Sequence, residues 1–219
     1  MIRPTPPGAV LFDCDGVLAD TEMLVNQLVA TELSARGWPM DAEEARRLFL
    51  GMAWPDMRPA VEARTGKLPA GWEDAFSRRI TEFLAAQTLP IPGAIEALRL
   101  IAARVPVAVA SNSSRRELET KMERLGLLTI FGQRCFSFED VARPKPAPDI
   151  YLAAAAACGL PPAECVVVED SLAGVRAGLA AGCQVLGFCR DTPEAVLWQA
   201  GAETFRSMAA LPAMLRLTS

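Results

Sequence analysis

The sequence predicts an α/β fold, in which a Rossmann-like open parallel sheet carries an inserted all-helical domain. Strand-like and helical segments alternate from residue 89 to the end of the chain. Two of the strand-like segments, 105–110 and 165–169, are continuously apolar, as parallel strands are when helices cover both faces of the sheet. Residues 20–88, in contrast, contain helical segments and no strand candidate. This order of elements indicates a sheet with right-handed crossovers and one helical insertion.

The composition is typical of a globular protein. The chain has 219 residues, of which 51% are hydrophobic and 22% are charged. The formal net charge is −4 and the basic residues are scattered, which argues against a nucleic-acid or membrane-surface partner. No apolar run is long enough to span a membrane, and residues 1–7 do not resemble a signal peptide, so we expect a cytoplasmic location. The sequence does not determine the oligomeric state, and a monomer is compatible with it.

Cysteine, histidine and lysine usage narrows the chemistry. The 6 cysteines show no Cys-x-x-Cys spacing and lie mostly in apolar runs, which favours reduced, buried thiols over disulfides or a zinc site. The chain has no histidine, so a histidine general base, a Ser-His-Asp triad and a His-ligated metal are excluded. Lysine occurs only at positions 67, 121 and 145, and each of these needs an explanation.

The chain divides into a helical insertion and an α/β core. The predicted helices of the insertion are 20–36, 41–50, 54–65 and 71–87. The predicted core elements after it are helices 93–103, 115–125, 148–158, 172–181, 193–200 and 207–217 and strands 105–110, 135–137, 165–169 and 183–188. We therefore expect an inserted helical domain of residues 19–88 and a core domain of residues 1–18 and 89–219.

Polar side chains follow four of the predicted strands. They are Asp13 and Asp15 after the first strand, Ser111 and Asn112 after 105–110, Lys145 after 135–137, and Glu169 and Asp170 at the end of 165–169. Because ligands of open α/β sheets bind beyond the carboxyl ends of the strands, we expect these side chains to share one site. Each residue alone has a structural explanation, such as a helix cap for Asp170 or a solvated loop for Lys145. Their convergence at one edge favours the functional interpretation.

The residue types at this edge suit phosphate chemistry with a metal ion. Asp13, Asp15 and Asp170, with Glu169 beside them, form an all-oxygen acidic cluster of the kind that binds Mg²⁺. An ammonium, hydroxyl groups and a cation can together neutralise a dianion such as phosphate. An aspartate can attack phosphorus to form an aspartyl-phosphate, and a second acid can protonate the leaving oxygen.

The sequence closely resembles the haloacid dehalogenase superfamily over nearly its whole length. Residues 13–22 resemble the first motif, Asp-x-Asp-Gly with its apolar lead-in. Ser111 fits the second motif, Lys145 within 143–149 fits the third, and 169–178 fits the fourth. The helical insertion is similar to the α-helical cap domain of the subfamily that includes β-phosphoglucomutase and phosphoglycolate phosphatase.

The resemblance implies a role for each of these residues. Asp13 would be the nucleophile and a metal ligand, and Asp15 would be the general acid/base and a ligand through its backbone carbonyl. Asp170 would complete the Mg²⁺ site, and Glu169 would act mainly on the ligands without binding the metal directly. Ser111 and Lys145 would bind the phosphoryl group, with Asn112 assisting. The peptide bond between Lys145 and Pro146 is often cis in such proteins.

The same resemblance separates several activities. Dehalogenases of the superfamily lack an acid at the position of Asp15, so its presence favours phosphate chemistry. Phosphonatases use a cap lysine as a Schiff base, and the only cap lysine here, Lys67, lies in a Thr-Gly-Lys turn that does not suit this role. β-Phosphoglucomutases carry a cap histidine and a phosphate-binding arginine; here the histidine is absent, Trp54 stands near the arginine position, and Arg58 is the nearest substitute.

The predicted function is a Mg²⁺-dependent phosphatase that acts on a small phosphorylated metabolite, with a β-phosphoglucomutase-like mutase as the alternative. A phospho-acceptor signalling domain of the receiver type also combines acids, a hydroxyl and a lysine on an open sheet, but such domains are shorter and lack a helical insertion. A catalytically silent binding protein would usually have lost one of these groups. The sequence leaves the substrate open among sugar phosphates, phosphoglycolate-like acids and nucleotides.

Overall fold

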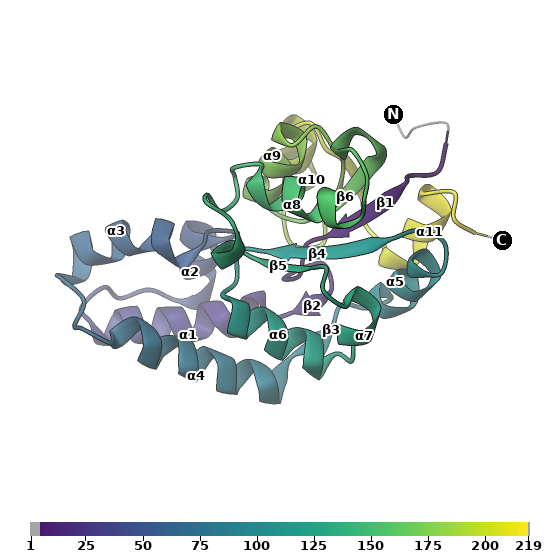
Figure 1. Cartoon of the computed structure of the whole chain (residues 1–219). Helices are drawn as coiled ribbons and strands as arrows, with labels where there is room; N and C mark the ends of the chain where they lie inside the picture. Colours follow the sequence, from purple (N-terminus) through teal and green to yellow (C-terminus); the bar gives the residue numbers. More distant parts are fainter. Residues whose placement is uncertain (1–4, 219) are drawn as a thin grey trace.

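The computed structural model describes residues 5–218, except for the side chain of Glu22. These residues form a six-stranded parallel sheet in the order β5-β4-β1-β6-β7-β8, with helices on both faces (Figure 1). The strands are β1 (Ala9–Phe12), β4 (Val107–Ser111), β5 (Cys135–Ser137), β6 (Cys165–Glu169), β7 (Gln184–Phe188) and β8 (Glu203–Phe205). The predicted α/β class and open parallel sheet are confirmed.

Strand β1 lies at the point where the strand order reverses. It pairs with β4 on one side and with β6 on the other, so that Val10 lies opposite both Val107 and Val166. The chain proceeds from β1 toward β4 and β5 on one side and toward β6, β7 and β8 on the other. In such sheets a crevice opens beyond the carboxyl ends of the strands at the reversal. The two acids that follow β1 therefore lie where a ligand is expected.

Each face of the sheet buries its own apolar core. Val10 and Phe12 point to one face and Ala9 and Leu11 to the other, and all four are fully buried. The first face is covered by α5 (Ala94–Ala102), α6 (Arg115–Arg124), α7 (Leu128–Phe131) and α11 (Leu211–Met214). The second face is covered by α8 (Asp149–Ala157), α9 (Leu172–Ala180) and α10 (Glu194–Gln199). Burial on both faces explains why the central strands are continuously apolar.

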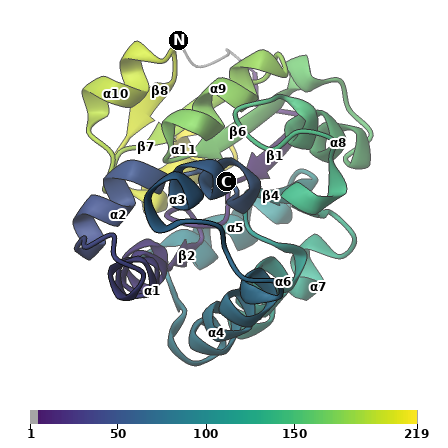
Figure 2. The same ribbon diagram turned by 90° about the vertical axis from the view of Figure 1, so that its left-hand side faces the viewer.

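Four helices that follow β1 form a separate layer, which we call the cap. They are α1 (Glu22–Ala35), α2 (Ala42–Phe49), α3 (Trp54–Thr65) and α4 (Trp72–Gln87). The cap lies beyond the carboxyl ends of the sheet strands, on the left of Figure 1 and toward the viewer in Figure 2. It has its own apolar core, which includes Leu33, Val61 and Leu84. The insertion is therefore all-helical, as the sequence predicts.

A short antiparallel ribbon joins the cap to the core. Strand β2 (Ala19–Asp20) pairs with β3 (Leu89–Pro90), so the two connections run side by side. This ribbon cannot be predicted from the sequence pattern, because each strand has only two residues and its partner lies on the far side of the insertion. The pairing places the two connections at residues 19–20 and 89–90.

Other differences from the predicted elements lie at the periphery. The predicted helix 207–217 is a 3₁₀ turn, Met208–Ala210, followed by the short α11, because Pro212 is tolerated only in the first turn of a helix. The short α7 and the edge strand β8 were not predicted. Residues 1–4, part of the segment that does not resemble a signal peptide, lie outside the described residues. Within the part that is described, no helix has the length and apolar content of a membrane span.

The cysteines are free and mostly buried, as the sequence predicts. All 6 are free thiols, and 5 of them are buried, Cys158 being half-buried. Cys14, between the two acids, is fully buried in the core and takes no part in the polar site.

We predict that Gly178→Val destabilises the fold through the contact between α9 and the sheet. A Cβ at Gly178 would lie 2.8 Å from Val185 Cγ2 and 3.3 Å from Val167 Cβ, so the helix would have to move away from β6 and β7. Overpacking of this kind costs about 1–3 kcal/mol. Urea unfolding should show this loss, whereas Ala180→Val, at an exposed position of the same helix, should cost about 0.5 kcal/mol from helix propensity alone. Equal losses in the two variants would contradict the packing argument.

Candidate active site

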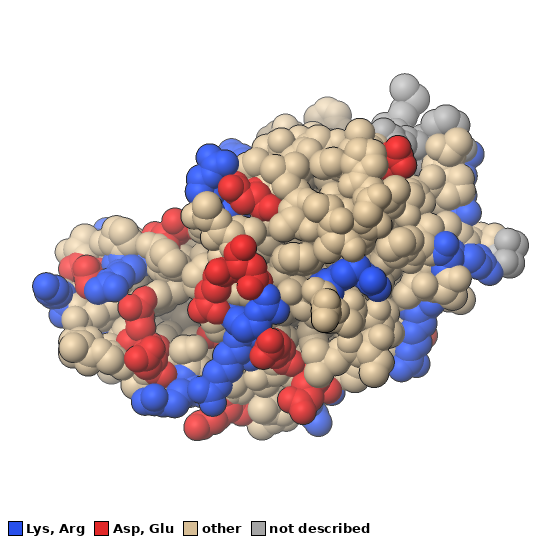
Figure 3. Space-filling model, viewed as in Figure 1, with Lys and Arg blue, Asp and Glu red and all other residues tan. Residues whose placement is uncertain are grey.

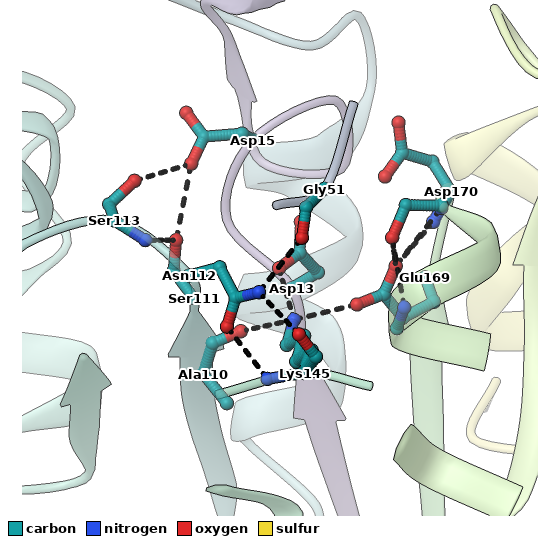
Figure 4. A network of polar contacts seen from close by, with 12 residues as sticks. Asp13, Asp15, Gly51, Ala110, Ser111, Asn112, Ser113, Lys145, Glu169 and Asp170 are labelled. Carbon is teal, nitrogen blue, oxygen red and sulfur yellow. Dashed lines mark hydrogen bonds and ion pairs between the residues drawn. The ribbon is translucent and has the colours of Figure 1, made fainter. Parts of the chain in front are cut away.

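The polar residues predicted from the strand ends line one cavity between the cap and the core. Its volume is about 490 Å³. The core contributes Asp13, Asp15, Ser111, Asn112, Lys145 and Asp170, and Glu169 lies directly behind them. Figure 4 shows Asp13 at the centre of this group, with Asp15 on one side and Asp170 on the other. The structure thus brings together the residues that the sequence predicts to share a site.

Lys145 forms the centre of a buried ionic cluster. Its ammonium donates hydrogen bonds to Asp13 Oδ1, to Glu169 Oε1 at 2.6 Å and to the carbonyl oxygen of Ala110 at 2.8 Å. The side chain is only 2% exposed. Burial lowers the pKa of Lys145, but the carboxylates of Asp13 and Glu169 raise it more, so the net shift is upward and the amine stays charged. A permanent positive charge therefore lies beside the oxygen of Asp13.

Glu169 holds this cluster in place. Its Oε1 accepts hydrogen bonds from Lys145 and, at 2.8 Å, from the hydroxyl of Tyr151. Its Oε2 accepts from the backbone N–H groups of Asp170 and Ser171 at 3.0 and 3.1 Å and from the Ser171 hydroxyl at 3.0 Å. Gly174 makes room for it, because a Cβ there would lie 1.6 Å from Glu169 Oε1. Glu169 is thus engaged on both oxygens and orients the residues around it.

Three acids lie close enough to share a cation. Carboxylate oxygens of Asp13, Glu169 and Asp170 lie within 4.8 Å of one another, and all three residues are buried. An all-oxygen donor set of this kind fits Mg²⁺ rather than a metal that prefers nitrogen or sulfur. Because five donors already surround Glu169, Asp13 and Asp170 are the better direct ligands. Asp170 also depends on Gly16, where a Cβ would lie 2.1 Å from Asp170 Oδ2.

The pKa of Asp13 reflects its burial and the charged groups around it. Burial raises the pKa of Asp13 to about 7; Lys145 opposes the shift, and the carboxylates of Glu169 and Asp15 add to it. A second positive charge beside Asp13 would favour its ionised form. The donor set and the cost of ionising Asp13 thus both fit a cation bound between Asp13 and Asp170.

Asp15 has a lysine of its own, which the sequence analysis did not assign. The Lys121 ammonium lies 2.7 and 2.6 Å from the two carboxylate oxygens of Asp15 and 2.6 Å from the Ser113 hydroxyl. Asp15 also accepts hydrogen bonds from the hydroxyls of Thr21 and Ser113, the latter at 2.9 Å. Burial raises the pKa of Asp15, but Lys121 lowers it more, and the net shift is downward. Lys121, 1% exposed, holds this acid as a carboxylate.

One sequence signal could have identified Lys121. Within α6, Leu118, Lys121 and Met122 are all buried, so the lysine falls on the helix face that covers the sheet. A charged residue on an apolar helix face is buried only when it has a partner. The partner, Asp15, lies 106 residues earlier in the chain, so helix periodicity alone cannot name it.

The second-motif residues connect the two halves of the site. The Ser111 hydroxyl donates to Asp15 Oδ2 at 3.2 Å and accepts from the backbone N–H of Ser113 at 3.0 Å. Asn112 donates to the carbonyl oxygens of Gly51 and Lys145 at 2.8 and 3.0 Å, and its Oδ1 accepts from the Lys145 N–H at 3.0 Å. Asn112 therefore ties the cap loop at Gly51 to the loop that carries Lys145, and its phosphate-binding role stays a prediction. The peptide bond between Lys145 and Pro146 is cis.

The cap residues singled out in the sequence have different surroundings. Trp54 lines the cavity and packs on Trp72 with a ring-centroid distance of 5.1 Å. Arg58 is engaged within the cap, where it donates to Glu62 at 3.2 Å and to Glu73 at 3.1 Å. The exposed Lys67 does not belong to the residues that line the cavity.

Comparison with known proteins agrees with this geometry. The haloacid dehalogenase-like hydrolase family matches residues 7–182. The chain belongs to this family. Its relatives in the family include the 6-phosphogluconate phosphatase of Escherichia coli K12, which is 30% identical over 206 residues, or 93% of this chain and 92% of the relative.

Two further members of the family extend the comparison. Hexitol phosphatase A of the same bacterium is 36% identical over 190 residues, or 84% of each chain. A crystal structure of a HAD family hydrolase from Deinococcus radiodurans, with bound phosphate and sodium, has a TM-score of 0.76 and 34% identity and covers 98% of this chain and 99% of its own. The haloacid dehalogenase fold of the chain, predicted from its motifs, is thereby confirmed.

We predict that Lys121→Met destabilises the protein by about 3 kcal/mol. This is at the low end for breaking a buried ion pair, because the Asp15 side chain keeps 25% exposure. In a double-mutant cycle measured by urea unfolding, Asp15→Asn with Lys121→Met should cost less than the sum of the single variants. Arg206→Met, which removes an exposed partner of Glu194, should barely change the unfolding midpoint. Additive losses at positions 15 and 121 would show that the pair is not coupled.

Proposed function

We propose that this protein is a Mg²⁺-dependent phosphatase that hydrolyses a small phosphorylated metabolite through an aspartyl-phosphate intermediate. The observation that supports this most strongly is Asp13, held beside the Lys145 ammonium and the Asp170 carboxylate in a cavity large enough for a small metabolite. Two of its relatives, the 6-phosphogluconate phosphatase and hexitol phosphatase A, are named as phosphatases of small phosphorylated compounds.

Substrate binding would use charges that the fold already holds in place. The phosphoryl group would lie against the Lys145 ammonium and the Ser111 hydroxyl, both of which line the cavity. Asp13 and Asp170, with the backbone carbonyl of Asp15, would hold Mg²⁺. When bound, the ion supplies positive charge that offsets the repulsion between the acids and the phosphate. Because the acids lie at strand ends and Lys145 is held by Asp13 and Glu169, little reorganisation is needed when the substrate arrives.

The reaction divides into two displacements at phosphorus. Lys121 keeps Asp15 ionised until the negatively charged phosphate binds; that added charge favours the neutral carboxyl group, so Asp15 takes up a proton from solvent. An oxygen of Asp13 then attacks the phosphorus, the bond to the alcohol oxygen breaks, and Asp15 gives that oxygen its proton. A water molecule then attacks the same phosphorus, Asp15 takes up one of its protons, and the bond to Asp13 breaks. One water is consumed, and the products are the alcohol and inorganic phosphate. Asp15 lies in the same cavity as Asp13, held by Thr21, Ser113 and Lys121.

The cap favours hydrolysis over phosphosugar mutase activity. Arg58 is paired with Glu62 and Glu73 and does not line the cavity, and the chain has no histidine. We also propose that residues 19–88 act as a lid that moves about the ribbon of β2 and β3, while residues 1–18 and 89–219 form the catalytic core. The cytoplasmic location stays a prediction.

We predict that Asp13→Asn abolishes phosphate release from p-nitrophenyl phosphate. The amide keeps the shape of the side chain but cannot attack phosphorus, so turnover should fall by at least about 10³-fold. Phosphate release and circular dichroism should be measured together, because the fold should persist. Asp191→Asn, an exposed surface change of the same chemistry, should keep wild-type turnover. Retained turnover in Asp13→Asn would exclude Asp13 as the nucleophile.

We predict that EDTA abolishes activity and that added Mg²⁺ restores it. Mg²⁺ should also raise the melting temperature of the wild-type protein, since a ligand that binds only the folded state stabilises it. Asp170→Asn should lose most of this thermal shift, because it removes a carboxylate from the acidic cluster. Full activity in EDTA, or an equal shift in Asp170→Asn, would contradict the proposed metal site.

A further inference from the structure

The cap side of the cavity is apolar and rich in aromatic rings. Trp54 packs on Trp72 with ring centroids 5.1 Å apart, and Trp72 stacks on Phe76 at 5.0 Å with an interplanar angle of 20°. All three rings line the cavity. Further lining side chains from the cap are Val25, Val29, Phe49, Met52, Met57 and Ile80. The part of a substrate that points away from the phosphate site would therefore meet apolar walls.

The charges around the cavity are unevenly distributed. Among the described lining residues the only cations are Lys121 and Lys145, and both are bound to carboxylates of the core. The acids that line the cavity away from the phosphate site include Glu73 and Asp74 of the cap and Glu139 of the core. Figure 3 shows acidic side chains on both sides of the hollow where the cap meets the core. The phosphate site is thus the one part of the cavity equipped for an anion.

This distribution has a direct consequence for the substrate. A second negative charge on the alcohol part would lose its hydration and would lie near acids instead of a cation. An uncharged apolar or aromatic group would instead bury its surface against the rings of Trp54, Trp72 and Phe76. The two effects act in the same direction.

We propose that the substrate is a phosphomonoester of an uncharged alcohol with an apolar or aromatic face, and that the cap excludes substrates with a second negative charge. This inference rests on the proposed phosphatase function and adds a substrate class to it. Trp54 is the residue that determines specificity for the apolar face, and Glu73 contributes to the rejection of anions.

The test uses synthetic phosphomonoesters in matched pairs, with Mg²⁺ present. Benzyl and ethyl phosphate both release a primary alcohol, so the ratio of their kcat/KM values measures how much contact with the apolar wall contributes. 4-Carbamoylbenzyl and 4-carboxybenzyl phosphate have nearly the same size, so their ratio reports the added charge. We expect each ratio to be at least tenfold in favour of the first compound. A ratio near one in either pair, or a preference for the carboxylate, would overturn the proposal.

Variants connect the ratios to named residues. Trp54→Ala should lower the benzyl-to-ethyl ratio at least fivefold, whereas Trp198→Ala, at a surface position 67% exposed, should leave it unchanged. Glu73→Gln removes a cavity charge and one of the two carboxylate partners of Arg58, so it should raise kcat/KM for the carboxylate compound about threefold. Glu62→Gln, the other partner of Arg58 and not a lining residue, should not. Equal effects of the paired variants would contradict the assignments.

The failure of this inference can be told apart from failure of the proposed function. If p-nitrophenyl phosphate is hydrolysed in an Asp13-dependent manner but the ratios are near one, the phosphatase function stands and the substrate class is wrong. If p-nitrophenyl phosphate is not hydrolysed at all, the phosphatase function itself is wrong. The wild-type ratios decide the matter even if Trp54→Ala does not fold.

Discussion

The site depends on one buried interaction, the contact of the Lys145 ammonium with the carboxylates of Asp13 and Glu169. Burying an unpaired charge at this depth would cost much free energy, and each of the three charged groups offsets the desolvation cost of the others. The same cluster spans three elements, because Asp13 follows β1, Glu169 ends β6 and Lys145 lies in the loop between β5 and α8. The backbone carbonyl of Ala110 in β4 completes the lysine's contacts at 2.8 Å. The Lys145 ammonium therefore contacts residues at the ends of all three central strands, β1, β4 and β6.

A second ion pair, Lys121 with Asp15, divides the acids into two kinds. Asp13 has an upward-shifted pKa and lies between a lysine and other acids, whereas Asp15 has a downward-shifted pKa and is surrounded by donors. Two acids one residue apart at a strand tip thus have opposite environments. Bound Mg²⁺ would favour ionised Asp13, and a bound phosphate would favour protonated Asp15, which are the states that the proposed nucleophile and acid need. Rings and acids of the cap line the rest of the cavity, and we propose that they determine which alcohol part can enter.

Much of this could be predicted from the sequence, because it depends on residue patterns within single segments of the chain. Continuous apolar runs predicted β4 and β6, and helical periodicity predicted α3 with the bounds 54–65. The positions of Asp13, Ser111, Lys145 and Asp170 after strands predicted that they share one edge, and they line one cavity. What the sequence did not reveal depends on contacts between distant segments. The pairing of β2 with β3 crosses the whole insertion, and Lys121 reaches Asp15 across 106 residues. The backbone contacts of Asn112 with Gly51 likewise connect residues 61 positions apart.

The proposed mechanism requires that the Asp13 carboxylate forms a covalent bond to phosphorus. The most direct measurement is an acid quench of the enzyme during turnover of a phosphomonoester with Mg²⁺, followed by mass spectrometry of the peptide that contains residues 9–18. We expect one added phosphoryl group on Asp13, which disappears when the substrate is exhausted and is absent in Asp13→Asn. Phosphate release with no phosphorylated peptide at any time after mixing, or with the label on another residue, would contradict it.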